Sequence, residues 1–346
     1  MKNRRHFLKK AGILTTGLTM AGQLGFPANE HKQIIKPQPL KKGDTIGIVA
    51  PASAVPDPER VKEFVSFLES KGYKVMIGEH VFERFGYLAG TDEQRASDIN
   101  KMFENPEVKA IIAARGGWGG ARLLELIDYE LIKNNPKIIM GYSDVTSLLL
   151  GINHKTDLIT FHGPVGISDW NKFTLKNFTK LAIKNKTIKL KGHKKDEEDL
   201  EKGRFMINGG KATGKLYGGN LTVLCTMIGS EYLPDFSGSI LLIEDVGERV
   251  YKVDRYLVQL KLAGVLDKVA GIVFSSCNSC DPEEIPEKGF SLKQILQQNI
   301  EPLGIPAFFG TMIGHIDEQY TLPIGMEVEI NADKGKIKLL EHALKD

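Results

Sequence analysis

The chain has 346 residues, of which 42% are hydrophobic and 26% are charged, as in an ordinary soluble globular protein of about two domains. Its formal net charge of +3 is unevenly placed, because residues 1–28 contain five Lys or Arg and no Asp or Glu. The rest of the chain is slightly acidic, and nothing in it indicates a nucleic-acid partner.

The first segment, residues 1–28, resembles a twin-arginine export signal. Its arginine pair at positions 4 and 5 is followed by Phe7-Leu8-Lys9, and a weakly apolar stretch runs from there to Phe26. That stretch is shorter and more polar than the ~20 apolar residues that span a membrane. We therefore expect an exported, periplasmic protein with no stable membrane insertion once the signal has been removed.

From residue 45 onward, strand and helix signals alternate. The apolar run Thr45–Ala50 predicts a buried parallel strand, and Asp57 followed by Pro58 predicts the start of a helix. Thr91-Asp92-Glu93-Gln94 matches a capping box that begins the next helix. Further strands are expected at residues 74–77, 108–113 and 137–140. This repetition predicts an α/β domain over residues 40–167, with a mainly parallel sheet.

Residues 168–205 are rich in Lys, Asn, Asp and Glu, which predicts a solvated connection between domains. A second domain is expected over residues 206–342. Its predicted strands are 239–243, 269–274, 305–309, 326–330 and 336–340, and its predicted helices are 250–263 and 292–299.

Ser143 lies where a predicted strand gives way to a helix. A serine at such a corner exposes its hydroxyl, and the amides that start the helix can stabilise an oxyanion. The position also suits a helix cap, and spacing alone slightly favours that plainer role. The pattern G-x-S-x-G is absent because Val145 stands where its second glycine would be, so an ordinary α/β-hydrolase is not indicated.

A glycine-rich loop, Arg115–Gly120, follows the preceding strand in the same way. Its glycines allow backbone amides to approach a ligand closely, and Arg115 can hold a carboxylate in bidentate fashion. The lysine and the hydroxyl residue of a phosphate-binding P-loop are missing. The loop is thus a candidate source of a second oxyanion donor.

Three further side chains are candidates for acid–base chemistry. Glu244 ends a buried apolar run, where a desolvated carboxylate needs a partner such as an imidazole, although helix capping is an alternative role. His315 and His162 both lie in turns, and the residues alone do not choose between them as general base. No metal site is expected, because H-E-x-x-H and similar ligand spacings are absent.

The cysteines are Cys225, Cys277 and Cys280. The last two have C-x-x-C spacing without the second ligand pair of a zinc site. In an oxidising compartment they can form a disulfide, and two free thiols in a loop are an equally good interpretation.

Taken together, these segments resemble the LD-carboxypeptidase family, which includes the microcin C self-immunity proteins. The resemblance covers roughly residues 40–340 and implies a flavodoxin-like or Rossmann-like N-terminal domain. It also implies a C-terminal mixed α/β domain of the swivelling β/β/α type, with the active site between the two. The motifs that carry it are Ile46–Ser53, Arg115–Gly120, Gly141–Thr146, His162–Pro164, Gly218–Leu221, Leu242–Asp245 and Gly314–His315.

The family's catalytic serine, glutamate and histidine fall on Ser143, Glu244 and His315, which decides against His162. The candidates for oxyanion and substrate binding are Gly117, Asp144, Arg115, Trp118 and Asn220. The resemblance implies a homodimer that needs no cofactor and releases D-Ala from the LD-peptide bond of murein tetrapeptides. The alternatives are a hydrolase of peptidyl or aminoacyl nucleotides and a non-catalytic exported binding protein. Family enzymes are typically cytoplasmic, whereas this leader indicates export.

Overall fold

The structure is a computed structural model that describes residues 34–192, 194–195, 203–280 and 289–346. The predicted signal, residues 1–28, lies outside the described residues, as do residues 196–202 of the charged segment. In the part of the chain that is described, no helix is both long and apolar enough to cross a bilayer. Residues 34–346 form one compact unit.

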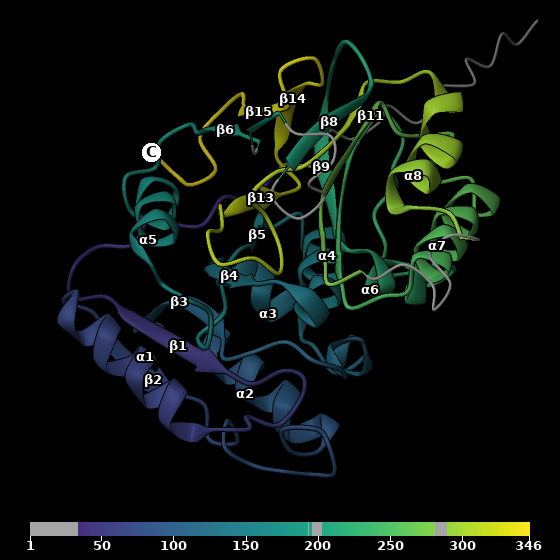
Figure 1. Cartoon of the computed structure of the whole chain (residues 1–346). Coiled ribbons are helices and arrows are strands. Elements are labelled where there is room, and N and C mark those ends of the chain that lie inside the picture. The colour runs from purple at the N-terminus through teal and green to yellow at the C-terminus, as the bar shows by residue number, and fades with distance from the viewer. Residues whose placement is uncertain (1–33, 193, 196–202, 281–288) are drawn as a thin grey trace, which may run out of the picture. The chain divides into compact units, whose positions relative to one another are not determined.

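The first sheet has six strands in the order β13-β5-β4-β3-β1-β2 (Figure 1). Strands β1 to β5 are parallel, and their order 2-1-3-4-5 is the flavodoxin-like one, so the predicted fold of this half is confirmed. Strand β13 joins the edge in the antiparallel sense. The bounds are β1 Thr45–Val49, β2 Lys74–Ile77, β3 Val108–Ala113, β4 Ile138–Gly141, β5 Thr160–His162 and β13 Leu322–Ile324.

The helices of this half begin largely where the sequence predicts. Asp57 caps α1 (Pro58–Ser70), and Thr91 and Gln94 form the capping box of α2 (Asp92–Glu104). The glycine-rich loop leads into a short 3₁₀ turn, Gly120–Leu123, and Asp128 then caps a separate helix, α3 (Tyr129–Asn134). Helix α4 (Thr146–Thr156) is almost fully buried.

The second sheet has nine strands in the order β6-β15-β14-β9-β10-β11-β12-β8-β7. Strands β9 to β12 are parallel and most of the flanking pairs are antiparallel, so the mixed α/β character predicted for this half is confirmed. The strands are β6 Lys189–Lys191, β7 Lys194–Lys195, β8 Gly203–Asn208, β9 Lys211–Asn220, β10 Ile240–Val246, β11 Gly271–Asn278, β12 Ala307–Phe309, β14 Glu327–Asn331 and β15 Lys336–Leu339.

The remaining α-helices of the described residues are α5 (Lys172–Phe178), α6 (Leu221–Thr226), α7 (Val250–Leu262) and α8 (Leu292–Ile300). Helices α7 and α8 lie side by side in Figure 1, and the amide of Asn299 donates to the carboxylate of Asp254 between them at 2.8 Å. Strands β10 and β11 are buried along nearly their whole length, as expected of parallel strands covered on both faces.

The chain crosses between the two sheets more often than the predicted division at residues 168–205 allows. That segment contains α5 and the strand β6, which pairs with β15, because buried residues such as Phe178 and Leu190 interrupt its charged ones. Farther on, β13 returns from the second half of the chain to the edge of the first sheet. The connection from β12 to β13 therefore runs between the sheets, and it contains His315.

Candidate active site

Ser143 occupies a sharp corner between β4 and α4. Its φ angle is +62°, in the left-handed region that a residue with a Cβ adopts only at a cost of about 1 kcal/mol or more. The neighbouring helix starts have no side-chain cap, and the described residues offer its hydroxyl no hydrogen-bond partner. The capping role that spacing alone favoured is therefore wrong. A serine that follows a parallel strand in a strained conformation and caps no helix has the geometry of a nucleophile elbow.

The glycine-rich loop lies directly against this corner. A Cβ added at Gly116 would lie 2.9 Å from the Cβ of Ser143 and 3.1 Å from its Oγ. Gly117 has a φ of +118°, and a Cβ there would overlap the Ser53 hydroxyl. The Asp144 carboxylate accepts a hydrogen bond from the amide of Gly120 at 2.6 Å. The residue after the serine thus ties the loop to the corner through its side chain.

Buried and half-buried side chains hold the loop from behind. Ser53, after β1, accepts a hydrogen bond from the amide of Trp118 at 2.9 Å, and the buried Arg95 donates to the carbonyl of Gly119 at 3.0 Å. Arg115 donates to the carbonyls of Gly116 and Ala54, both at 3.0 Å. Sequence reasoning missed Ser53 and Arg95 because their partners are backbone atoms distant in sequence. The loop follows β3 and contacts Ser53 after β1, and the point between these two strands is the switch point where such sheets bind ligands.

Glu244 and His315 form a buried pair. Glu244 has 0% exposure within β10, and its Oε2 lies 2.7 Å from Nδ1 of His315. Burial by itself would raise the pKa of Glu244, but the charge and hydrogen bond of His315 outweigh it, and the pKa is lowered. Burial would lower the pKa of His315, but the charge of Glu244 outweighs it, and the pKa is raised. Each group therefore stabilises the ionised form of the other.

Two contacts bring this pair to the serine corner. The ring of Tyr142, the residue before Ser143, meets the ring of His315 edge-on with centroids 4.8 Å apart. The amide of Asn220, at the end of the strand beside Glu244, donates to the hydroxyl of Thr146 at 3.1 Å. Ser143 and His315 are not hydrogen-bonded to each other in the described structure. Such contacts are often long in unliganded enzymes and tighten when substrate binds.

His162, the competing base, has a different environment. It is 1% exposed, and neither ring nitrogen has a hydrogen-bond partner among the described residues. Burial lowers the pKa of His162 to about 4, so its imidazole is neutral at physiological pH. The centroid of its ring lies 6.2 Å from that of Tyr142, and no carboxylate among the described residues is hydrogen-bonded to it. The structure therefore favours His315 as the base.

Comparison with known proteins identifies the family. The model of the LD-carboxypeptidase N-terminal domain matches residues 46–163, and that of the C-terminal domain matches residues 213–330. The chain belongs to the LD-carboxypeptidase family. This is a family of peptidases, and the resemblance seen in the sequence is confirmed.

Individual members of the family match over most of their length. A probable murein peptide carboxypeptidase of Bacillus subtilis is 39% identical over 86% of this chain and 91% of its own. The microcin C7 self-immunity protein solved with aspartyl sulfamoyl adenosine has a TM-score of 0.80 at 31% identity, covering 90% of this chain and 100% of its own. The muramoyltetrapeptide carboxypeptidase of Oxalobacter formigenes has a TM-score of 0.74 at 30% identity, covering 85% and 97%.

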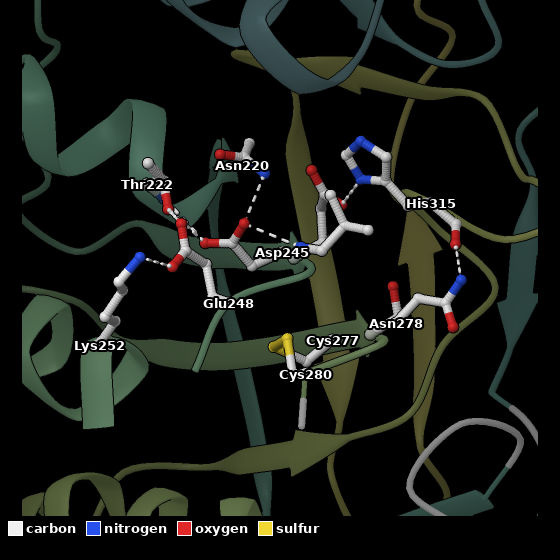
Figure 2. The surroundings of a disulfide bond; sticks show 12 residues. Asn220, Thr222, Asp245, Glu248, Lys252, Cys277, Asn278, Cys280 and His315 are labelled. Carbon is white, nitrogen blue, oxygen red and sulfur yellow. Dashed lines mark hydrogen bonds and ion pairs between the residues drawn. A yellow bond between two sulfur atoms is a disulfide. The ribbon is translucent and has the colours of Figure 1, made fainter. Parts of the chain in front are cut away.

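The remaining candidates of the family site have distinct surroundings. Trp118 is 51% exposed beside the glycine-rich loop; its ring meets that of Tyr87 edge-on at 5.6 Å, and the Arg122 guanidinium lies over the ring, 5.8 Å from its centroid. Asn220 is buried, and its Nδ2 donates to Asp245 at 3.0 Å (Figure 2). Its Oδ1 caps α6 by accepting from the amide of Val223 in the first turn of that helix. These contacts give Asn220 a structural role that the sequence did not predict.

The cysteines can also be placed. A disulfide joins Cys277 and Cys280, which resolves the alternative left open by the sequence, whereas Cys225 is free and buried. No group of three or more His, Cys, Asp or Glu that could hold a metal ion occurs among the described residues.

The close approach of Gly116 to the serine gives a first prediction. Gly116→Ala should lower kcat/KM by about 10²-fold while the protein stays folded, because the new methyl group would sit beside Oγ and displace it. The rate of hydrolysis and the thermal midpoint together test this. Gly209→Ala is the matched control, since its nearest neighbour is the exposed carboxylate of Asp333. Equal activity of the two variants would contradict the placement of the loop.

Proposed function

We propose that this protein is a serine carboxypeptidase that hydrolyses the LD-peptide bond of murein tetrapeptides and releases the terminal D-Ala. The observation that carries the proposal is the 2.7 Å pair of Glu244 and His315, which packs through Tyr142 against the strained Ser143. A fully buried carboxylate that is paired with a histidine, close to a serine at a sharp strand-to-helix corner, is the arrangement of a catalytic triad.

In the proposed mechanism, Nε2 of His315 takes the proton of Ser143 as Oγ attacks the carbonyl carbon of the LD bond. Glu244 accepts the hydrogen bond of Nδ1–H, fixes the tautomer and stabilises the imidazolium. The amides of Asp144 and Gly117 hold the oxyanion. His315 then donates its proton to the leaving amine of D-Ala, and water, activated by the same imidazole, hydrolyses the acyl-enzyme. Arg115 as an anchor for a substrate carboxylate stays a prediction.

The substrate assignment is supported by the similarity to a probable murein peptide carboxypeptidase and to a muramoyltetrapeptide carboxypeptidase. Mass spectrometry of muropeptides after incubation with the purified protein tests it. Tetrapeptides should lose one alanine, and tripeptides should stay unchanged. If the tetrapeptides persist although a fluorophosphonate labels Ser143, the assigned substrate is wrong and the nucleophile assignment stands.

The structural match to the self-immunity protein bound to aspartyl sulfamoyl adenosine favours a second candidate substrate, an aminoacyl nucleotide. The same triad would then cleave the aminoacyl bond, and the exposed ring of Trp118 would be available for stacking on a base. Parallel assays with tetrapeptide and with an aminoacyl sulfamoyl adenosine decide between the two. Repeated failure of fluorophosphonate labelling on folded protein would instead favour a non-catalytic binding protein.

We further propose that the protein acts outside the cytoplasm, because the arginine pair at positions 4 and 5 opens a leader without acidic residues. Replacing both arginines by lysine keeps the charge, so any loss of export must come from lost recognition. The variant should accumulate in the cytoplasm, as cell fractionation would show, and unchanged export would refute the proposal. Homodimerisation stays a prediction that analytical ultracentrifugation can check.

A further inference from the structure

The disulfide lies beside the strand that carries Glu244. Cys277 is level with Asp245 in the β10–β11 pair, and the bond to Cys280 closes the turn Asn278-Ser279 (Figure 2). Ser279 has a left-handed φ of +54°, so the turn is tight. The disulfide thus encloses a two-residue turn next to the proposed catalytic pair.

Asn278, inside this turn, connects the elements that carry Glu244 and His315. Figure 2 shows its amide directed at the main chain of His315, where Nδ2 donates to the carbonyl oxygen at 3.0 Å. Its own carbonyl accepts from the amide of Gly247, just after β10, at 2.9 Å. Of the side chains at this end of β11 that hold the 313–315 loop, Asn278 is the one that contacts the histidine residue itself.

Two serines of β11 also hold the 313–315 loop. Ser275 and Ser276 each donate to the carbonyl of Ile313 at 2.9 Å. Both serines are buried, and they lie where the pairing of β10 with β11 is interrupted, between Phe274 and Cys277. Asn278 is paired opposite Val246 as the last residue of the strand and is only half-buried, so its side chain borders directly on the turn that the disulfide closes.

We infer that Asn278 is a positioning residue for His315 and that the Cys277–Cys280 disulfide holds it there, so that reduction of the cysteine pair lowers the activity. This rests on the proposed function. A closed disulfide ring limits the conformations of the turn, whereas two thiols leave Asn278 more rotational freedom to lose when its hydrogen bond forms. A small displacement of a general base is costly, because proton transfer requires hydrogen-bond distance.

The reduction is a thiol–disulfide exchange with a dithiol such as dithiothreitol. A reagent thiolate attacks Sγ of the half-buried Cys280, breaks the S–S bond, and releases Cys277 as a thiolate that takes up a proton. The second reagent thiol then displaces Cys280. Two electrons and two protons pass to the enzyme, and the reagent leaves as a cyclic disulfide. Burial raises the pKa of Cys225 to about 12, so that thiol does not take part.

Kinetics of four forms test the inference: oxidised protein, reduced protein, Cys277→Ser/Cys280→Ser and Asn278→Ala. Asn278→Ala should lower kcat/KM by about tenfold, and reduction should lower it by about three- to tenfold. Because both changes act through the same contact, reducing the disulfide of the Asn278→Ala variant should lower its kcat/KM little further. Asn100→Ala is the matched control, since its amide donates to the carbonyl of Leu126 at the same 3.0 Å in the other half of the chain. The reductant should not affect the double serine variant.

Titration of the His315 imidazole by NMR supplies a readout that does not need turnover. Loosening the loop weakens the contact with Glu244, so the pKa of His315 should be lower in the reduced protein and in Asn278→Ala. If wild-type protein hydrolyses no tetrapeptide, the proposed function fails while this titration still decides the inference. Full reduction, verified by thiol counting, that changes neither kcat/KM nor the His315 titration would overturn it.

Discussion

Ser143→Ala is expected to lower kcat by about 10³-fold or more, because no acyl-enzyme can form without Oγ. The residual rate would come from the oxyanion amides and from substrate binding. Tetrapeptide hydrolysis measured at saturating substrate gives the effect. Ser70→Ala, whose hydroxyl donates only to the carbonyl of Phe67 on an exposed helix end, should leave kcat unchanged.

The strain at this corner sharpens the same prediction. Ser143→Gly should be as inactive as Ser143→Ala but more stable by about 1 kcal/mol, because glycine adopts a φ of +62° without the steric cost that alanine retains. Chemical denaturation of both variants measures this difference. Near-normal turnover by either folded variant would end the nucleophile assignment.

Glu244→Gln should lower kcat/KM by about 10²- to 10⁴-fold while preserving the shape of the site, because an amide neither stabilises the imidazolium nor enforces the required tautomer. Its pH profile should shift as well. In the wild type the base is active only when His315 is unprotonated, and Glu244 holds the pKa of His315 above its ordinary value. Without that charge, burial dominates and the pKa falls. The acid limb of the profile therefore moves to lower pH.

The control for this variant is Glu248→Gln, an isosteric change in the carboxylate network beside the pair. Glu248 lies 3.3 Å from the hydroxyl of Thr222 and 3.1 Å from the ammonium of Lys252, so its loss should change kcat/KM only a few-fold and leave the acid limb in place. An unmoved acid limb in Glu244→Gln would mean that His315 is not the group that titrates.

Local signals in the sequence predicted much of the first half. Asp57 and the Thr91–Gln94 box begin their helices because capping depends only on neighbours, and Ser143 follows its strand as expected. The choice of His315 over His162 needed the family resemblance. Both histidines were predicted to lie in turns. Only the tertiary structure shows that His162 is buried without a hydrogen-bond partner among the described residues, whereas His315 is paired with the carboxylate of Glu244.

The second half was harder to predict because its strands depend on distant partners. Strand β9 is rich in glycine and lysine, and β13 is three residues long, so neither has a clear hydrophobic period. The charged segment 168–205 hid α5 and β6 for the same reason. The roles of Arg95, Ser53 and the Asp144 carboxylate were also missed, since each binds a backbone group that only the folded loop presents.

The late return of the chain to the first sheet bears on biosynthesis. Strand β5 has β13 as its outer neighbour, so this edge stays unpaired on the ribosome until residues 322–324 have emerged. His315 arrives only shortly before them. A nascent or truncated chain that stops before residue 315 therefore carries the proposed nucleophile without its proposed base, and the proposed activity requires synthesis of the chain through β13.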